Sequence, residues 1–143
     1  MKLTKDILKD LYRECNELYF GGVLGRCDFS LFSKMYPYLG SYCAKEDKQG
    51  KIKDKIWFGT SVKWNEELLR QVMVHEMVHM YIRRVEGHKH DGVLGHGWRF
   101  RRQARRLRKE HGMEVLRWTK VEFYNEKFYP KRWEKILLWL IDR

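Results

Sequence analysis

The 143-residue chain is 43% hydrophobic and 15% aromatic, which predicts a single folded domain over residues 1–143 and excludes intrinsic disorder. Its 30 Lys and Arg residues outnumber its 19 Asp and Glu residues, and the formal net charge of +11 favours an anionic partner. No signal-peptide pattern occurs and no apolar stretch approaches about 18 residues, so we expect a cytoplasmic protein without a membrane segment. Three widely spaced cysteines without a CxxC pair favour reduced thiols over disulfides.

The first predicted element is a helix that begins after Thr4 and ends at Gly21. Thr4 is a suitable N-cap because its hydroxyl can accept a hydrogen bond from the first helical turn. Apolar residues recur at helical spacing from Ile7 to Tyr19, and the glycine pair that begins at Gly21 favours a left-handed turn that ends the helix.

Three short segments with strand-like patterns follow, at residues 28–32, 39–44 and 52–58. The last two are joined through residues 47–50, whose sequence Asp-Lys-Gln-Gly is typical of a hairpin turn. Together with the flanking helices, these segments predict an α+β fold with a small antiparallel sheet of about three strands.

The next predicted helix begins after Asn65, ends near Gly87 and contains the pattern His-Glu-x-x-His. Residues four apart on a helix differ by about 40° in azimuth and about 6 Å in rise, so His75 and His79 can direct both imidazoles at one metal ion. The carboxylate of Glu76 can then reach a water at that ion and act as a general base. The alternative is that the pattern is accidental and the histidines are ordinary hydrogen-bonded side chains.

A catalytic zinc ion usually has three protein ligands, so the histidine pair requires a third donor. His96 is the best candidate, because Gly95 and Gly97 give the backbone around it the freedom to approach the helix. The other candidates are His88, His90, Glu86, Glu110 and His111.

A strongly basic helix is predicted at residues 98–109, with a thinner apolar stripe of Trp98, Phe100, Ala104 and Leu107. Its basic residues are Arg99, Arg101, Arg102, Arg105, Arg106, Arg108 and Lys109. This face favours binding to DNA, because neutralising phosphates releases condensed counterions. The alternative is a solvated cationic face without a partner.

Beyond Met113, the sequence predicts an extended segment at residues 114–124 and a last helix that begins at Pro130. This helix is apolar over nearly its whole surface, so we expect it to be buried in the domain or against another protein.

Several motifs together carry a family resemblance. They are His75-Glu76-Met77-Val78-His79, Tyr81, Gly95-His96-Gly97 and Phe100, with Tyr19 to Leu24 and Leu39 to Cys43 upstream. Over about residues 5–112 this pattern resembles the SprT-like zinc metallopeptidases, the group that includes the DNA-dependent protease Spartan. The resemblance implies zinc on His75, His79 and His96, with Glu76 as the catalytic base. Several relatives add a cysteine-rich zinc module that residues 113–143 do not contain, which removes support for DNA contact through such a module.

The predicted protein is therefore a zincin-like α+β metallopeptidase with one Zn²⁺ per chain, whose helices include the one with the histidine pair. The resemblance implies protein substrates on or near DNA, with the basic helix as the DNA contact. Two alternatives remain open: a zinc-containing nucleic-acid-binding module without turnover, and a zinc hydrolase of small peptides or amides unrelated to DNA.

Overall fold

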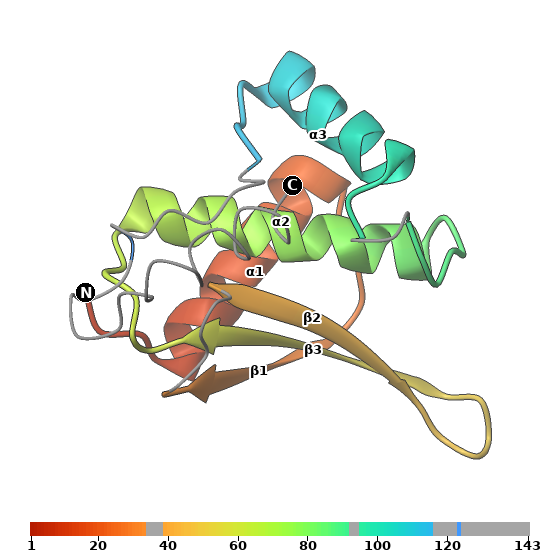
Figure 1. Cartoon of the computed structure of the whole chain (residues 1–143), viewed down its shortest axis with the longest axis horizontal. Coiled ribbons are helices and arrows are strands. Elements are labelled where there is room, and N and C mark those ends of the chain that lie inside the picture. Colours follow the sequence, from red (N-terminus) through yellow and green to blue (C-terminus); the bar gives the residue numbers. More distant parts are fainter. Residues whose placement is uncertain (34–38, 92–94, 116–122, 124–143) are drawn as a thin grey trace, which may run out of the picture.

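The computed structural model describes residues 1–33, 39–91, 95–115 and 123, and it confirms the predicted α+β class with a three-stranded sheet. Figure 1 shows α1 and α2 on one side of this sheet, with α3 on the far side of α2. In chain order the elements are α1 (Lys5–Phe20), β1 (Cys27–Phe32), β2 (Gly40–Glu46), β3 (Ile52–Gly59), α2 (Glu66–Arg84) and α3 (Trp98–His111).

The sheet has the strand order β1-β3-β2 and is mixed. The pair β2 and β3 is antiparallel, as predicted for the hairpin, whereas β1 pairs with β3 in parallel, from Cys27 opposite Asp54 to Phe32 opposite Gly59. The prediction of a wholly antiparallel sheet is therefore wrong. The physical reason is the order of the strands: the chain reverses direction between β1 and β2 and again at the hairpin, and β3 then lies between them.

The ends of the helices and the hairpin follow the local signals. Thr4 Oγ1 accepts a hydrogen bond from Ile7 N at 3.2 Å, and Asn65 Oδ1 accepts one from Leu68 N at 2.8 Å, so both predicted N-caps are confirmed. Gly21, with φ of 60°, ends α1 in the left-handed conformation. In the hairpin, Asp47 Oδ1 accepts hydrogen bonds from the backbone of Gln49 and Lys51.

The core lies between the sheet and α2. Ile56 and Phe58 of the central strand and Met73 and Met77 of α2 are fully buried. Because α2 contacts α1, β2 and α3, ten of its 19 residues are buried, and it is the most enclosed helix in the described part of the chain. None of the helices in that part is long and apolar enough to cross a membrane.

The predicted helix from Pro130, and all of the extended segment 114–124 except its first two residues and Phe123, lie outside the described residues. Met113 is buried, and Val115 and Phe123 pack against the core. The carbonyl of Phe123 also accepts a hydrogen bond from Lys63 N at 2.6 Å, next to the start of α2.

Candidate metal centre

Helix α2 carries the histidine pair near its midpoint. His75 and His79 are one helical turn apart, and their Nε2 atoms lie 3.3 Å from each other. Both side chains are partly exposed, although the helix on either side of them is buried. The regular α-helical geometry that begins at the Asn65 cap is therefore sufficient to bring these two nitrogen atoms together.

His96 joins the pair from the segment that leads into α3. Its Nε2 atom lies 3.0 Å from Nε2 of His75 and 3.2 Å from Nε2 of His79. The preceding residue, Gly95, has φ of +74°, a conformation that residues with a Cβ rarely adopt. A Cβ there would lie 3.6 Å from His79 Cε1, an ordinary contact distance, so the positive φ and not the lack of space favours glycine at this position.

The triangle of Nε2 atoms has the dimensions of a metal site. Tetrahedral zinc with nitrogen ligands at about 2.0–2.1 Å requires about 3.3 Å between two ligand atoms. The three distances, 3.0, 3.2 and 3.3 Å, are close to this value. These histidines form the one group of potential ligands in the described residues in which at least three side chains converge, and they can hold one metal ion.

The other candidates for the third donor lie elsewhere. Glu86 Oε1 accepts hydrogen bonds from two side chains of α3, and Glu110 pairs with Arg106. His111 packs edge-on against the ring of Tyr19, with ring centroids 5.3 Å apart. His88 and His90 are exposed. Among the described residues, His96 is therefore the candidate that the fold brings to the pair.

Glu76 points into the interior beside the histidines. It is 6% exposed, and its Oε1 lies 3.9 Å from His75 Nε2. Burial raises the pKa of its carboxyl group to about 8, and a hydrogen bond from the backbone of Tyr42 on β2 opposes this shift. The Tyr42 hydroxyl donates to Asp54 on β3 at 2.5 Å, so the strand that contacts Glu76 is itself held in place.

The family follows from this constellation and a sequence comparison. A family model described as the SprT-like family matches residues 8–122, which include every helix and strand that contributes to the histidine cluster. The chain belongs to the SprT-like family. Comparison with curated proteins gave no match. Membership is consistent with a metallopeptidase-like domain, and a group of three histidines that can bind a metal ion is present.

In this SprT-like chain, burial also keeps His79 neutral. Desolvation, and to a smaller extent the neighbouring His96, lowers the pKa of His79 to about 3. The neutral imidazole has a free electron pair on one nitrogen, which is the form that binds metals.

Phe100 packs against all three imidazoles. Its ring centroid lies 4.8, 4.9 and 4.7 Å from the centroids of His75, His79 and His96, and the side chain is fully buried. Phe100 belongs to the motif that carried the resemblance, but the sequence alone placed it only in the apolar stripe of a helix. In the fold it closes the inner side of the cluster.

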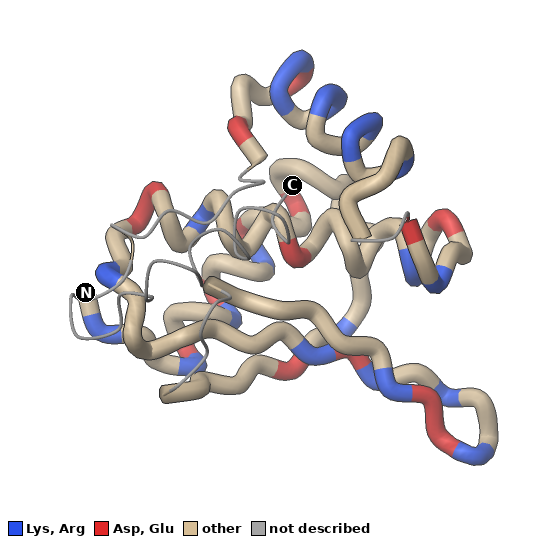
Figure 2. Tube along the Cα trace, viewed as in Figure 1, with Lys and Arg blue, Asp and Glu red and all other residues tan. Residues whose placement is uncertain are grey.

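The basic helix divides into two sets of residues, and Figure 2 shows its Lys and Arg positions along α3. One set is paired with carboxylates: Arg99 with Asp91 at 3.7 Å, Arg102 with Glu86 at 3.2 Å, and Arg106 with Glu110 at 3.2 Å. The other set is exposed and makes no ion pair with any described residue. It consists of Arg101, Arg105, Arg108 and Lys109.

Trp98 departs from the predicted apolar stripe. It is 54% exposed, and the guanidinium groups of Arg99 and Arg102 lie 4.6 and 4.9 Å from its ring centroid. The buried side of α3 instead contains Gln103, which is 7% exposed and donates to Glu86 at 2.8 Å. Trp98 is the first residue of α3, and its exposed ring is stabilised by these two cation–π contacts.

Two other residues at the site had only weak sequence signals. Gly40 begins β2, and a Cβ on it would lie 2.9 Å from the carbonyl oxygen of Trp57 and 3.0 Å from Val72 Cγ1. A glycine in a strand often marks such a close approach, but the sequence does not reveal the neighbour. Asp91 is a buried carboxylate six residues before the N-cap of α3, too far along the chain for a standard capping pattern.

Proposed function

We propose that the chain is a zinc-dependent metallopeptidase in which His75, His79 and His96 bind one Zn²⁺ and Glu76 is the general base. The observation that carries the proposal is the triangle of three Nε2 atoms, 3.0–3.3 Å apart, with a buried carboxylate beside it. Structural zinc sites are normally closed by four protein ligands, whereas a set of three leaves a position for water or substrate. Among the described residues no fourth ligand joins the group, which supports the catalytic alternative.

The chemistry divides between the metal and Glu76. Bound zinc supplies Lewis acidity, which polarises a peptide carbonyl and makes water a stronger nucleophile. Glu76 accepts one proton from the water as the water oxygen forms a bond to the carbonyl carbon. The same carboxyl group then donates that proton to the departing amine as the C–N bond breaks. Burial raises the proton affinity of Glu76, and the backbone N–H of Tyr42 orients the carboxylate.

Strand β2 is the proposed binding edge for an extended substrate. It is an outer strand of the described sheet, and it packs against α2 where Glu76 lies. A peptide that adds to an outer strand is bound through backbone hydrogen bonds, which tolerate many side chains. The hydrogen bond between Tyr42 and Glu76 connects this edge directly to the proposed base.

The proposed substrates are proteins associated with DNA, and the proposed DNA contact is one face of α3. Arg101, Arg105 and Arg108 follow each other at spacings of four and three residues, so they lie on the same side of the helix. Because carboxylates do not neutralise them within the described structure, they contribute most of the charge that α3 offers to phosphates. Arg99, Arg102 and Arg106 are already engaged and are expected to contribute less.

A digest of a mixed proteome tests the proposal. Zinc-loaded protein and the Glu76→Gln variant are each incubated with the proteome, with and without DNA, and new peptide ends are identified by mass spectrometry. We expect DNA-stimulated cleavage that falls by about 10²-fold or more in Glu76→Gln, because an amide cannot accept the proton, while zinc content persists.

The other outcomes separate the alternatives. Equal peptide release by the two forms excludes Glu76 as the base, and no release by either form favours a nucleic-acid-binding module without turnover. Cleavage that depends on Glu76 but not on DNA favours a zinc hydrolase whose basic surface has another role.

A further inference from the structure

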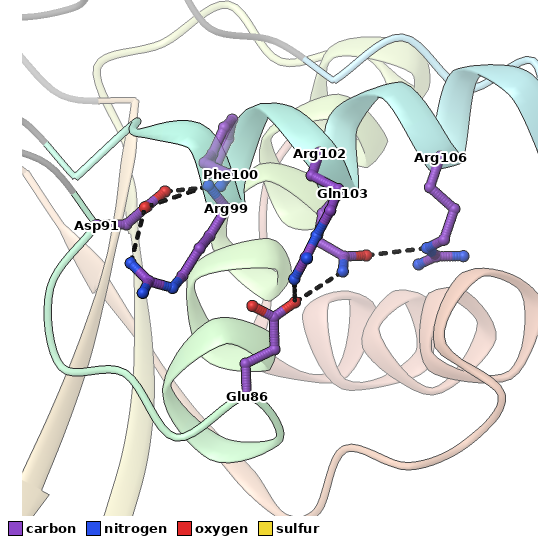
Figure 3. Close-up of polar contacts among 7 residues, drawn as sticks. All are labelled: Glu86, Asp91, Arg99, Phe100, Arg102, Gln103 and Arg106. Atoms are coloured by element: carbon purple, nitrogen blue, oxygen red, sulfur yellow. Dashed lines mark hydrogen bonds and ion pairs between the residues drawn. The ribbon is translucent and has the colours of Figure 1, made fainter.

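Asp91 makes an unusual set of contacts at the start of α3. Its carboxylate accepts hydrogen bonds from the backbone N–H groups of Arg99, at 3.2 Å, and Phe100, at 2.6 Å (Figure 3). Its backbone carbonyl accepts a third, from Gly97 N at 3.0 Å. The side chain is buried, with 4% of the residue exposed, and Arg99 Nη1 lies 3.7 Å from its Oδ1.

These contacts replace an absent helix cap. The first N–H groups of a helix have no partner inside it, and an N-cap side chain normally accepts from the second or third of them. The N-cap of α3 is Gly97, which makes no such bond, and the second and third helical residues are Arg99 and Phe100. Asp91 therefore caps α3 from six residues upstream of the N-cap, with its negative charge at the positive end of the helix dipole.

The capped segment contains His96. Asp91 accepts hydrogen bonds from Gly97, which directly follows His96, and from Arg99 and Phe100, which lie three and four residues after His96. Phe100 in turn packs its ring against the imidazoles of His75, His79 and His96. The Asp91 carboxylate thus fixes the position of the backbone that follows His96 and of the Phe100 ring that packs against its imidazole.

We propose that Asp91 is a positioning residue of the metal centre, which holds His96 and Phe100 so that His96 Nε2 stays within ligand distance of the α2 pair. This inference rests on the proposed metal site. Asp91 does not contact the ligand nitrogen atoms, so it acts through the backbone of the segment after His96. Residues that orient metal ligands in this way reduce the entropy lost when the metal binds.

The chain provides a matched control in Glu86. This carboxylate also connects the segment after α2 to α3, through Arg102 at 3.2 Å and Gln103 at 2.8 Å (Figure 3). None of its recorded hydrogen bonds or ion pairs is to His96 or Phe100. Replacing Glu86 therefore removes the same charge and a comparable link to α3, but leaves the cap of the helix intact.

The test measures zinc affinity by competition with a chromophoric chelator, in the wild-type protein and in the Asp91→Ala and Glu86→Ala variants. We expect Asp91→Ala to weaken zinc binding by about 10- to 100-fold, as is typical for residues that orient ligands. Glu86→Ala should change it by less than about 3-fold. Thermal unfolding of the metal-free proteins checks that each variant is folded.

A double-mutant comparison separates positioning from general stability. In the His96→Ala background the ligand that Asp91 positions is gone, so adding Asp91→Ala should produce no further loss of zinc affinity. If Asp91→Ala does not fold, Asp91→Asn takes its place. An asparagine keeps one oxygen to accept from Phe100 N–H, so this variant should fold and lose less affinity than the alanine variant would.

Two results would overturn this inference and leave the proposed metal site standing. One is an equal loss of zinc affinity in the Asp91 and Glu86 variants, and the other is a loss from Asp91→Ala that persists in the His96→Ala background. Both would show that Asp91 acts through the stability of the helix contact. If wild-type protein binds no zinc, the proposed function fails and the inference fails with it.

Discussion

Helices α2 and α3 pack against each other but present their polar residues in opposite ways. Helix α2 places Glu76 in the interior, at 6% exposure, among ten buried residues. Helix α3 buries Phe100, Gln103 and Leu107 and leaves most of its charged side chains at the surface. Burying a carboxylate costs free energy unless hydrogen bonds or an opposite charge compensate, so such a residue is usually retained for a function, whereas an exposed arginine costs almost nothing. Position inside the protein therefore makes Glu76 a stronger functional indicator than any single arginine of α3.

The same contrast occurs within α3. Arg106 binds Glu110 and also donates to the carbonyl of Tyr19 at 2.9 Å, which ties α3 to the end of α1. Arg105, one residue earlier, is exposed without an ion pair in the described part of the chain. Adjacent residues of the same type thus differ in role, one as a structural connector and the other as a free charge. Four experiments test the different roles proposed for α2, for α3 and for the segments that contact them, from the largest expected effect to the smallest.

The largest effect is expected on zinc binding, from replacement of His96, the one proposed ligand that lies outside α2. His96→Ala should lose its zinc on desalting, because the two remaining ligands on one helix hold the ion only weakly. The zinc-to-protein ratio is measured by elemental analysis after desalting, with about one ion per chain expected in the wild-type protein. His90→Ala is the control, since His90 is an exposed histidine in the same connection. Full zinc in His96→Ala together with loss in His90→Ala would show that the third ligand is assigned to the wrong residue.

Charge reversal on the free face of α3 should strongly weaken DNA binding. In the triple variant Arg101→Glu, Arg105→Glu and Arg108→Glu, each lost phosphate contact lowers the slope of log affinity against log salt by about 0.7 to 0.9. Fluorescence anisotropy with a labelled duplex at several salt concentrations measures both quantities. Zinc content should be unchanged, because none of the three contacts the histidine cluster.

The control for the triple variant reverses three exposed lysines of the hairpin region, Lys48, Lys51 and Lys53, which changes the net charge equally. If both triple variants reduce DNA affinity to the same extent, overall charge and not the face of α3 is responsible. Negligible affinity of the wild-type protein at about 50 mM salt would leave α3 as a solvated surface.

A medium effect is expected where β2 meets α2. Gly40→Ala places a methyl group 2.9 Å from the Trp57 carbonyl oxygen and 3.0 Å from Val72, so it should lower the free energy of unfolding by about 1–3 kcal/mol. Chemical denaturation of the metal-free protein measures this. Gly25→Ala is the control, because a Cβ at Gly25 meets nothing within 4 Å. Equal stability of the Gly40 variant and the wild-type protein would mean that β2 can move away from α2 at little cost.

The smallest effects compare a helix cap with a surface ion pair. Asn65→Ala removes the cap of α2 and should lower the free energy of unfolding by about 1 kcal/mol. Glu110→Gln removes an exposed partner of Arg106 on α3 and should change it by about 0.5 kcal/mol or less. Denaturation midpoints at matched slopes give both values. A larger loss for Glu110→Gln than for Asn65→Ala would contradict the view that α3 charges contribute little to stability.

Much of the fold was predictable because its signals are local. Thr4 and Asn65 cap the helices that follow them, and the segment from Asp47 to Gly50 forms the expected hairpin turn. The proximity of His75 and His79 is also local, since four residues on a helix nearly complete a turn. The pairing of β1 with β3 was not predictable in this way, because a strand pattern carries no information on which neighbour it joins.

By itself, then, the sequence determined the described helices and strands, the helix caps at Thr4, Gly21 and Asn65, and the placement of the two histidines on α2, since each depends on residues within one or two turns of the chain. Only the tertiary structure decided that His96 meets them, that Gly40 lets β2 approach Val72 of α2, and that Asp91 caps α3 across its connection. It also decided which arginines are paired and that Trp98 is exposed. These features depend on contacts between segments distant in sequence, which are set by how the elements pack and not by local propensity.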